Sequence, residues 1–296
     1  MEERSHTSAA SAASESTARR MSRSAGSSVF MARIVRGLRT SPAPFFPSES
    51  RNIFSTMRMS PPALPRRVAA EFIGTTALVA VVVGSGIRAD SLSQDIGVRL
   101  IANAAASALG LGLLIALIGP LSGAHFNPVV TLSEWWSRRP ERGGREALAY
   151  IAAQLAGAVA GALLAEAMFG RAPGAWATEP RSAPHLLLGE AVATAGLVLV
   201  VQGLRHIGRP GLAPVAVAGY IGAAIWFTSS GSFANPAATL GRSFSDSFTG
   251  IAPASVPAFA AAQLLGMLLG MVLAGVLYGT HRTAGEPNGA EARRTG

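Results

Sequence analysis

The sequence contains two Asn-Pro pairs and two glutamates whose residue types and spacing are typical of a functional site. They are Asn127-Pro128-Val129 and Asn235-Pro236-Ala237, together with Glu71 and Glu190. Asparagine is favoured just before a helix and proline at its first position, so each pair predicts the start of a short helix. Two short helices that meet with their N-termini facing would create a positive zone with amide N–H donors. Such a zone can guide polar solutes.

The glutamates allow two interpretations. A pair of carboxylic acids can perform hydrolysis. However, both acids lie near the starts of apolar stretches, where a carboxylate must find hydrogen-bond donors. Main-chain N–H groups of the Asn-Pro connections are the expected donors. We therefore expect Glu71 and Glu190 to brace these connections, with no catalytic residue and no enzymatic activity.

His125 precedes the first Asn-Pro pair by two residues. The other histidines are scattered along the chain, at positions 6, 185, 206 and 281. We therefore expect His125 to hydrogen-bond within its loop rather than bind a metal ion, and we expect no metal site and no cofactor. The absence of cysteine excludes disulfides and thiolate catalysis.

The composition indicates a membrane protein. The chain has 296 residues, of which 49% are hydrophobic and only 14% are charged, against about 25% charged in soluble domains. A helix needs about 20 apolar residues to cross a bilayer. Six stretches meet this length approximately: Val68–Ile87, Leu100–Ile118, Ala147–Phe169, Leu186–Leu204, Leu212–Thr228 and Val256–Tyr278. The alternative, six buried helices of one soluble core, is disfavoured by their number.

The sequence repeats itself once. Glu71 corresponds to Glu190, Asn127 to Asn235, and Gln154 to Gln263, with offsets of 119, 108 and 109 residues. Each half holds three apolar stretches, and an odd number of crossings inverts the second half relative to the first. The Asn-Pro connections are too apolar for solvated loops, and irregular backbone at membrane depth must line a cavity. We therefore predict an all-α membrane protein with six transmembrane helices, two re-entrant half-helices and an inverted 3+3 repeat.

Composition also divides the chain into zones. Residues 1–63 are rich in Ser, Ala, Arg and Pro, and we expect them to be a disordered extension. Met57 and Met59 offer an alternative start of translation, and a transit peptide is the other interpretation. Residues 64–280 form the membrane domain, with repeats at about 64–170 and 184–280, and 281–296 form a tail. We expect no nucleic-acid partner for the arginine-rich start.

Arginine placement predicts the orientation, because cytoplasmic loops carry the excess of positive charge. One side of the predicted membrane domain carries nine arginines: Arg66, Arg67, Arg138, Arg139, Arg142, Arg145, Arg205, Arg209 and Arg282. The other side carries five: Arg88, Arg99, Arg171, Arg181 and Arg242. Both termini are therefore expected in the cytoplasm, with the protein spanning the inner (plasma) membrane several times.

The motifs resemble those of the aquaporin, or major intrinsic protein, family. They are Ala-Glu-Phe-Ile-Gly-Thr at 70–75, Ser-Gly-Ala-His-Phe-Asn-Pro-Val at 122–129 and Asn-Pro-Ala at 235–237. The resemblance covers about residues 64–280 and implies the aquaporin fold, one pore per subunit and a homotetramer. It also implies that the two glutamates brace the re-entrant loops. Val129 departs mildly from the family, which usually has alanine there.

The resemblance also implies a four-residue selectivity filter. Spacing from the two asparagines places it at Ser107, Ala223, Ser232 and Ala238. Most members of the family have arginine at the position of Ala238. Arg242 lies about one helical turn further on, and we expect it not to reach the constriction. The expected filter is wide, uncharged and faintly polar, similar to a bacterial aquaglyceroporin-like subgroup that lacks the arginine.

Three functions remain open from the sequence. The first is a passive channel for water and for small uncharged solutes larger than water, such as arsenite and other metalloid acids, glycerol or urea. The second is a water-selective or glycerol-selective aquaporin. The third is a coupled secondary transporter, which would need an intramembrane acid that faces its substrate.

Overall fold

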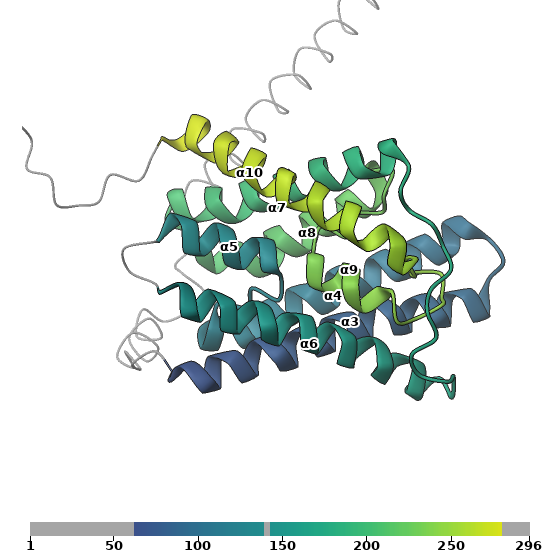
Figure 1. The fold of residues 1–296 in the computed structure, drawn as a ribbon. Coiled ribbons are helices and arrows are strands. Elements are labelled where there is room, and N and C mark those ends of the chain that lie inside the picture. The colour runs from purple at the N-terminus through teal and green to yellow at the C-terminus, as the bar shows by residue number, and fades with distance from the viewer. Residues whose placement is uncertain (1–61, 139–142, 280–296) are drawn as a thin grey trace, which may run out of the picture. The chain divides into compact units, whose positions relative to one another are not determined.

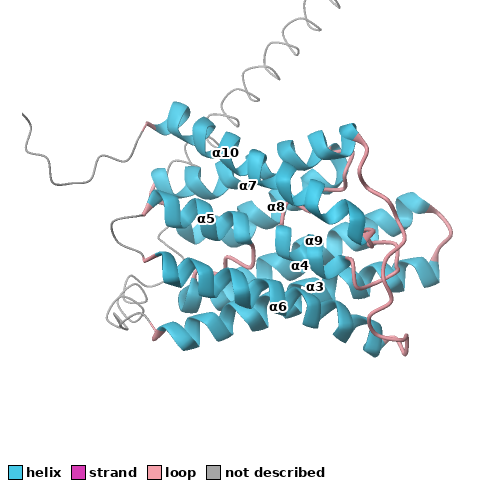
Figure 2. Ribbon diagram, in the orientation of Figure 1, coloured by secondary structure: helices cyan, strands magenta, loops and turns pink. Residues whose placement is uncertain are grey.

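The computed structural model describes residues 62–138 and 143–279, and its elements are numbered here as in Figure 1. Within these ranges every regular element is a helix (Figure 2). The segment before residue 62, for which disorder is expected, lies outside the described residues, as does the expected tail from 281 to 296.

Six helices in the described ranges are long and apolar enough to cross a membrane, which confirms the prediction from the apolar stretches. At about 1.5 Å per residue, even the shortest of them approaches the ~30 Å of a hydrocarbon core. They are α3 (Leu64–Leu92), α4 (Ile96–Ser122), α6 (Gly144–Met168), α7 (Pro184–His206), α8 (Ala213–Phe227, preceded by the 3-10 turn Pro210–Leu212) and α10 (Val256–Tyr278, preceded by the 3-10 turn Pro253–Ser255).

Two short helices follow the Asn-Pro pairs, as predicted. Helix α5 (Pro128–Ser137) follows α4, and α9 (Pro236–Arg242) follows α8. Both half-helices contact α6 and α10, and they also contact each other. In Figure 1, α9 lies among the long helices rather than at the edge of the bundle. Each half-helix is therefore held by long helices from both halves of the chain.

Equivalent helix pairs form the framework of each half. Helix α3 packs along α6 in the first half, and α7 packs along α10 in the second. Glycines allow the close approach: a Cβ atom on Gly157 would lie 2.6 Å from the carbonyl oxygen of Phe72, and one on Gly266 would meet the carbonyl oxygen of Ala191. Small residues that let helix backbones touch are a general feature of membrane interfaces.

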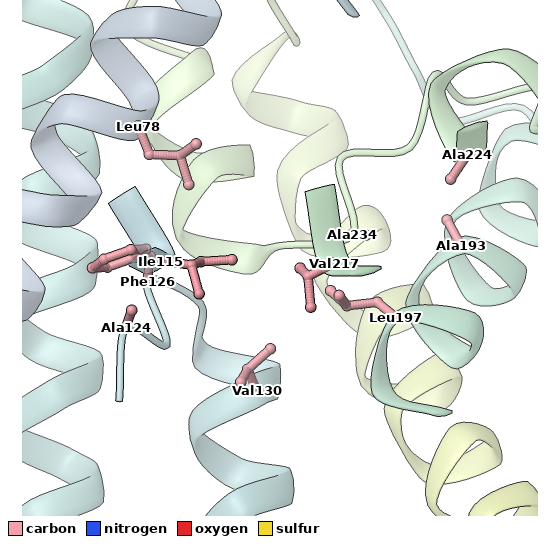
Figure 3. Close-up of a cluster of buried hydrophobic side chains, with 10 residues drawn as sticks. All are labelled: Leu78, Ile115, Ala124, Phe126, Val130, Ala193, Leu197, Val217, Ala224 and Ala234. Carbon is pink, nitrogen blue, oxygen red and sulfur yellow. The ribbon is translucent and has the colours of Figure 1, made fainter. Parts of the chain in front are cut away.

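A cluster of buried apolar side chains joins the two halves around the re-entrant loops (Figure 3). Phe126 and Ala234, the residues before the two asparagines, belong to it and are fully buried. Ala124 of the first loop also belongs to it, and the remaining members come from the long helices and α5: Leu78, Ile115, Val130, Ala193, Leu197, Val217 and Ala224. The loop ends are therefore fixed by packing as well as by hydrogen bonds.

Candidate functional site

Asn127 and Asn235 cap the two half-helices. The side-chain oxygen of Asn127 accepts a hydrogen bond from the main-chain nitrogen of Val129 at 3.0 Å. The side-chain oxygen of Asn235 accepts from the nitrogens of Ala237 and Ala238, at 2.9 and 3.2 Å. Both side-chain oxygens are thus committed to helix N–H groups that would otherwise lack an acceptor.

The same two side chains join the loops to each other. The amide nitrogen of Asn127 donates to the carbonyl oxygen of Ala234, and that of Asn235 donates to the carbonyl oxygen of Phe126, both at 2.8 Å. An amide nitrogen carries two hydrogens. One hydrogen of each asparagine therefore holds the opposite loop, and the second is left for the cavity that both residues line.

The two loops share an unusual backbone. Ala124 and Phe126 have φ values of 49°, and Ser232 and Ala234 have values of 49° and 47°. This left-handed region costs about 1–2 kcal/mol for a residue that is not glycine. The four residues stand three and one positions before each asparagine. The backbone repeats along with the sequence, and other contacts must stabilise it.

Glu71 supplies those contacts in the first loop. One carboxylate oxygen accepts from the hydroxyl of Ser122 at 2.6 Å and from the main-chain nitrogen of His125 at 3.0 Å. The other accepts from the nitrogen of Phe126 at 2.7 Å and from the side chain of Gln154 at 2.8 Å. The side chain of His125 lies 3.1 Å from the hydroxyl of Thr131. Both oxygens of this fully buried carboxylate are satisfied.

Glu190 makes the equivalent contacts in the second loop. Its carboxylate oxygens accept from the main-chain nitrogens of Phe233 and Ala234, each at 2.8 Å. The side chain of Gln263 donates to the same carboxylate at 2.6 Å. Gln263 also donates to Thr239 at 2.9 Å, just as Gln154 donates to Thr131. The repeat seen in the sequence is therefore also a repeat of hydrogen-bond networks.

An elongated cavity of about 850 Å³ passes both asparagines. Its lining includes Arg181, which precedes α7, and Arg205, in the last turn of α7. The cavity therefore extends along most of a helix that is long enough to cross a membrane. Residues of both re-entrant loops and of α3, α4, α5, α7 and α8 contribute to the wall.

Three of the four positions assigned to the filter line this cavity: Ser107, Ser232 and Ala238. Ala223 does not, and its side chain is exposed on α8. The cavity face of α8 carries Val217, Ile221 and Ile225, which follow the four-residue spacing of one helix face. Position 223 is two residues, or about 200°, away from its neighbours on that face. On this helix the cavity is therefore lined by Ile221 and Ile225 rather than by Ala223.

Arg242 also lines the cavity. It is the last residue of α9, and helical side chains lean toward the N-terminus of their helix. Its guanidinium thus reaches back over the ring of Phe233, 3.2 Å from the ring centroid. The guanidinium of Arg181 lies 5.3 Å from the same centroid. The wall near Phe233 therefore carries two guanidinium groups outside the four filter positions.

Arg181 lies in the connection between α6 and α7. Burial lowers the pKa of its guanidinium from the ordinary value, and the nearby carboxylates of Glu179 and Glu190 oppose that shift. Arginine has so high an ordinary pKa that it stays protonated in proteins. The side chain thus carries a positive charge beside the cavity.

The other end of the cavity carries an ion pair that the sequence analysis did not identify. Glu134, on α5, is buried and lies 2.9 Å from the guanidinium of Arg205, on α7. Arg138 is a weaker partner at 3.9 Å. All three residues line the cavity. No motif distinguishes Glu134 in the sequence, since the contact depends on how α5 packs against α7.

The cavity, the capped half-helices and the repeated networks agree with the comparisons to known proteins. The family model described as major intrinsic protein matches residues 58–227. The protein named aquaglyceroporin AqpS of Rhizobium meliloti (strain 1021) is 47% identical over 193 residues, which cover 65% of this chain and 82% of that protein. A probable aquaporin AqpM of Archaeoglobus fulgidus is 32% identical over 216 residues, which cover 64% and 86%.

A solved structure shows the same fold. The X-ray structure of the aquaglyceroporin from Plasmodium falciparum superposes with a TM-score of 0.54 at 22% identity, over 73% of this chain and 96% of that one. The family model alone matches more than half of the chain. The chain therefore belongs to the major intrinsic protein family.

Proposed function

We propose that this protein is a passive transmembrane channel for water and for small uncharged solutes larger than water, such as glycerol, urea and undissociated metalloid acids. The cavity that passes both asparagine side chains is the observation that carries this proposal. Ser107, Ser232 and Ala238 give its wall small side chains near the assigned filter. The name of the 47% identical relative, an aquaglyceroporin, supports a solute larger than water.

In this proposal each residue group has a separate task. The asparagines orient a passing solute through their remaining amide hydrogens and keep the two loops together. Glu71 and Glu190 maintain the strained loop backbone. Pro128, Val129, Pro236 and Ala237 begin the half-helices whose N–H groups bind the asparagine oxygens.

We also propose that the protein is a homotetramer in the inner membrane, with one pore in each subunit and both termini in the cytoplasm. An apolar stripe on α4 supports a contact with lipid or with a neighbouring subunit. It is formed by Leu109, Leu113 and Leu117, which are 75%, 61% and 63% exposed in the single chain. The excess of arginine on the side of the termini supports the orientation.

A coupled transporter is the weaker candidate. Such a transporter needs a titratable group that is exposed to its pathway. Glu71 and Glu190 are fully buried, they do not line the cavity, and loop and side-chain donors occupy their oxygens. Glu134 does line the cavity, but Arg205 neutralises it.

Stopped-flow light scattering on proteoliposomes tests the proposal. Vesicles with the protein should equilibrate water, glycerol, urea and undissociated arsenous acid faster than empty vesicles do. A channel also predicts rates that do not change when a protonophore collapses the proton gradient. Uptake that stops with the protonophore would instead support the coupled transporter.

A further inference from the structure

Two arginines at one end of the cavity have hydrogen-bonding capacity that the fold does not use. The Nε atom of Arg242 donates to the carbonyl oxygen of Thr249 at 2.5 Å, and that of Arg181 donates to the carbonyl oxygen of Gly250 at 2.9 Å. Consecutive residues of one loop therefore anchor both side chains. Among the described residues, the terminal nitrogens of the two guanidinium groups have no hydrogen-bond acceptor.

Neither guanidinium forms an ion pair with a carboxylate in the described part of the chain. The carboxylate oxygens of Glu190 accept from the second loop and from Gln263 instead. Two like charges thus face the same ring, that of Phe233, and no carboxylate of the described residues is within ion-pair distance of either. Stability alone does not account for this arrangement, because desolvated charges without partners are costly.

A hydroxyl of the second re-entrant loop is also unused. The Oγ atom of Ser232 is buried and has no hydrogen-bond partner among the described residues, and its residue is only 5% exposed. Ser232 immediately precedes Phe233 and lines the same cavity. Ser232, Arg181 and Arg242 therefore line the same cavity, to which Ala238 contributes only a methyl group.

We propose that Arg181 and Arg242, which both lie against Phe233, form an arginine pair with two functions. The pair excludes cations from the channel, and it donates hydrogen bonds to the oxygen atoms of passing solutes. This inference rests on the proposed channel function and assigns its selectivity to two residues outside the four filter positions. Guanidinium groups suit the task, because their planar donors remain charged and can hold two oxygens at once.

The charge explains cation exclusion. A potassium or hydronium ion that passes two guanidinium groups in a low-dielectric wall meets repulsion that bulk water would largely screen. A neutral polyol or an undissociated oxyacid does not meet that repulsion, and its hydroxyl oxygens can accept from the unused N–H groups. The same arginine pair can therefore block an ion and admit an uncharged solute.

Proteoliposomes with four single variants test the role of the arginine pair. Arg181→Ala and Arg242→Ala each remove one charge, and Arg242→Lys keeps the charge but loses the planar donors. Arg88→Ala is the matched control, because the guanidinium of Arg88 also lies over an aromatic ring, that of Phe169, at 5.9 Å, yet the residue does not line the cavity. Each variant is checked for reconstitution by the amount of protein in the vesicles.

Potassium flux and glycerol flux are measured on the same vesicles. Arg181→Ala and Arg242→Ala should each raise potassium flux by about tenfold or more, as expected for the loss of a nearby unit charge. Arg242→Lys should retain low potassium flux, and Arg88→Ala should match the wild type. Arg242→Lys should nevertheless lower glycerol flux relative to water flux, since an ammonium cannot replace the paired donors.

The two levels of the proposal fail in different ways. If wild-type vesicles pass neither water nor glycerol faster than empty vesicles, the channel function itself is wrong. If the wild type conducts water and glycerol but Arg181→Ala and Arg242→Ala still exclude potassium, the role of the arginine pair is wrong and the proposed channel function is not affected. If Arg242→Ala does not reconstitute because it loses its bond to Thr249, Arg181→Ala alone decides the question of charge.

Discussion

The amide nitrogen of Asn127 lies 2.8 Å from the carbonyl oxygen of Ala234, a residue 107 positions further along the chain. Asn235 makes the reciprocal bond to Phe126. Each asparagine thus caps its own half-helix with its oxygen and holds the opposite loop with its nitrogen. Two loops from different halves of the sequence are fixed to each other by the same side chains that line the cavity.

The double replacement Asn127→Asp and Asn235→Asp tests this dual role. A carboxylate cannot donate to the carbonyl oxygens of Phe126 and Ala234, and each lost hydrogen bond costs about 0.5–1.5 kcal/mol, with repulsion added. We expect a lower unfolding temperature and a cation leak, because negative charge would line the pathway. Thermal unfolding in detergent and conductance in voltage-clamped bilayers measure the two effects. Wild-type values for both would contradict the role assigned to the asparagines.

The two glutamates should be equally important to the loops. Glu71→Gln or Glu190→Gln replaces one acceptor oxygen with an NH₂ group that faces main-chain or glutamine donors. Hydrogen bonds to charged groups contribute about 1.5–3 kcal/mol each, so each variant should be clearly destabilised. Glu179→Gln is the control, because Glu179 is exposed. A thermal shift as small as that of the control would mean that the carboxylates do not stabilise the loops.

Glycine at the helix crossings is the third target. Gly157→Ala would place a Cβ atom 2.6 Å from the carbonyl oxygen of Phe72, so α6 and α3 must separate. Overpacking of this kind costs about 1–3 kcal/mol. Gly275→Ala, in α10, is the matched control, because a Cβ atom there meets nothing within 4 Å. Equal stability of the two variants, measured by thermal unfolding in detergent, would show that α3 and α6 do not need this close contact.

Ala238→Arg tests the size of the pathway. A guanidinium on its long side chain would occupy space that the methyl group leaves open beside Ser107 and Ser232. Flux of solutes larger than water should fall, and the loss should grow from urea to glycerol to erythritol, while water flux falls less. Stopped-flow swelling gives all four rates. A uniform loss for every solute would indicate damage to the fold rather than a narrower pore.

Much of the fold could be predicted from local patterns. Six apolar stretches gave six long helices, and each Asn-Pro pair gave a capped half-helix, because these features depend on neighbouring residues. Matched spacing also indicated the inverted repeat. These parts were predictable because the length of an apolar stretch, the capping preference of a residue and a repeated motif can all be recognised without knowledge of tertiary contacts.

The wall of the cavity was less predictable. Ala223 was assigned by counting back from Asn235, but the rotation of α8 directs Ile221 and Ile225 to the cavity instead. A count along the helix also does not show that the long side chain of Arg242 leans back over Phe233. The bonds from each asparagine to the opposite loop depend on how the two halves meet, which no local pattern specifies.

The measurement that tests the central claim most directly is swelling of wild-type proteoliposomes in a size series of neutral solutes. We expect water, urea, glycerol and arsenous acid to enter faster than into empty vesicles, with erythritol slower, and with the same rates after a protonophore is added. Vesicles that pass water but exclude glycerol and arsenous acid would contradict a pathway for solutes larger than water.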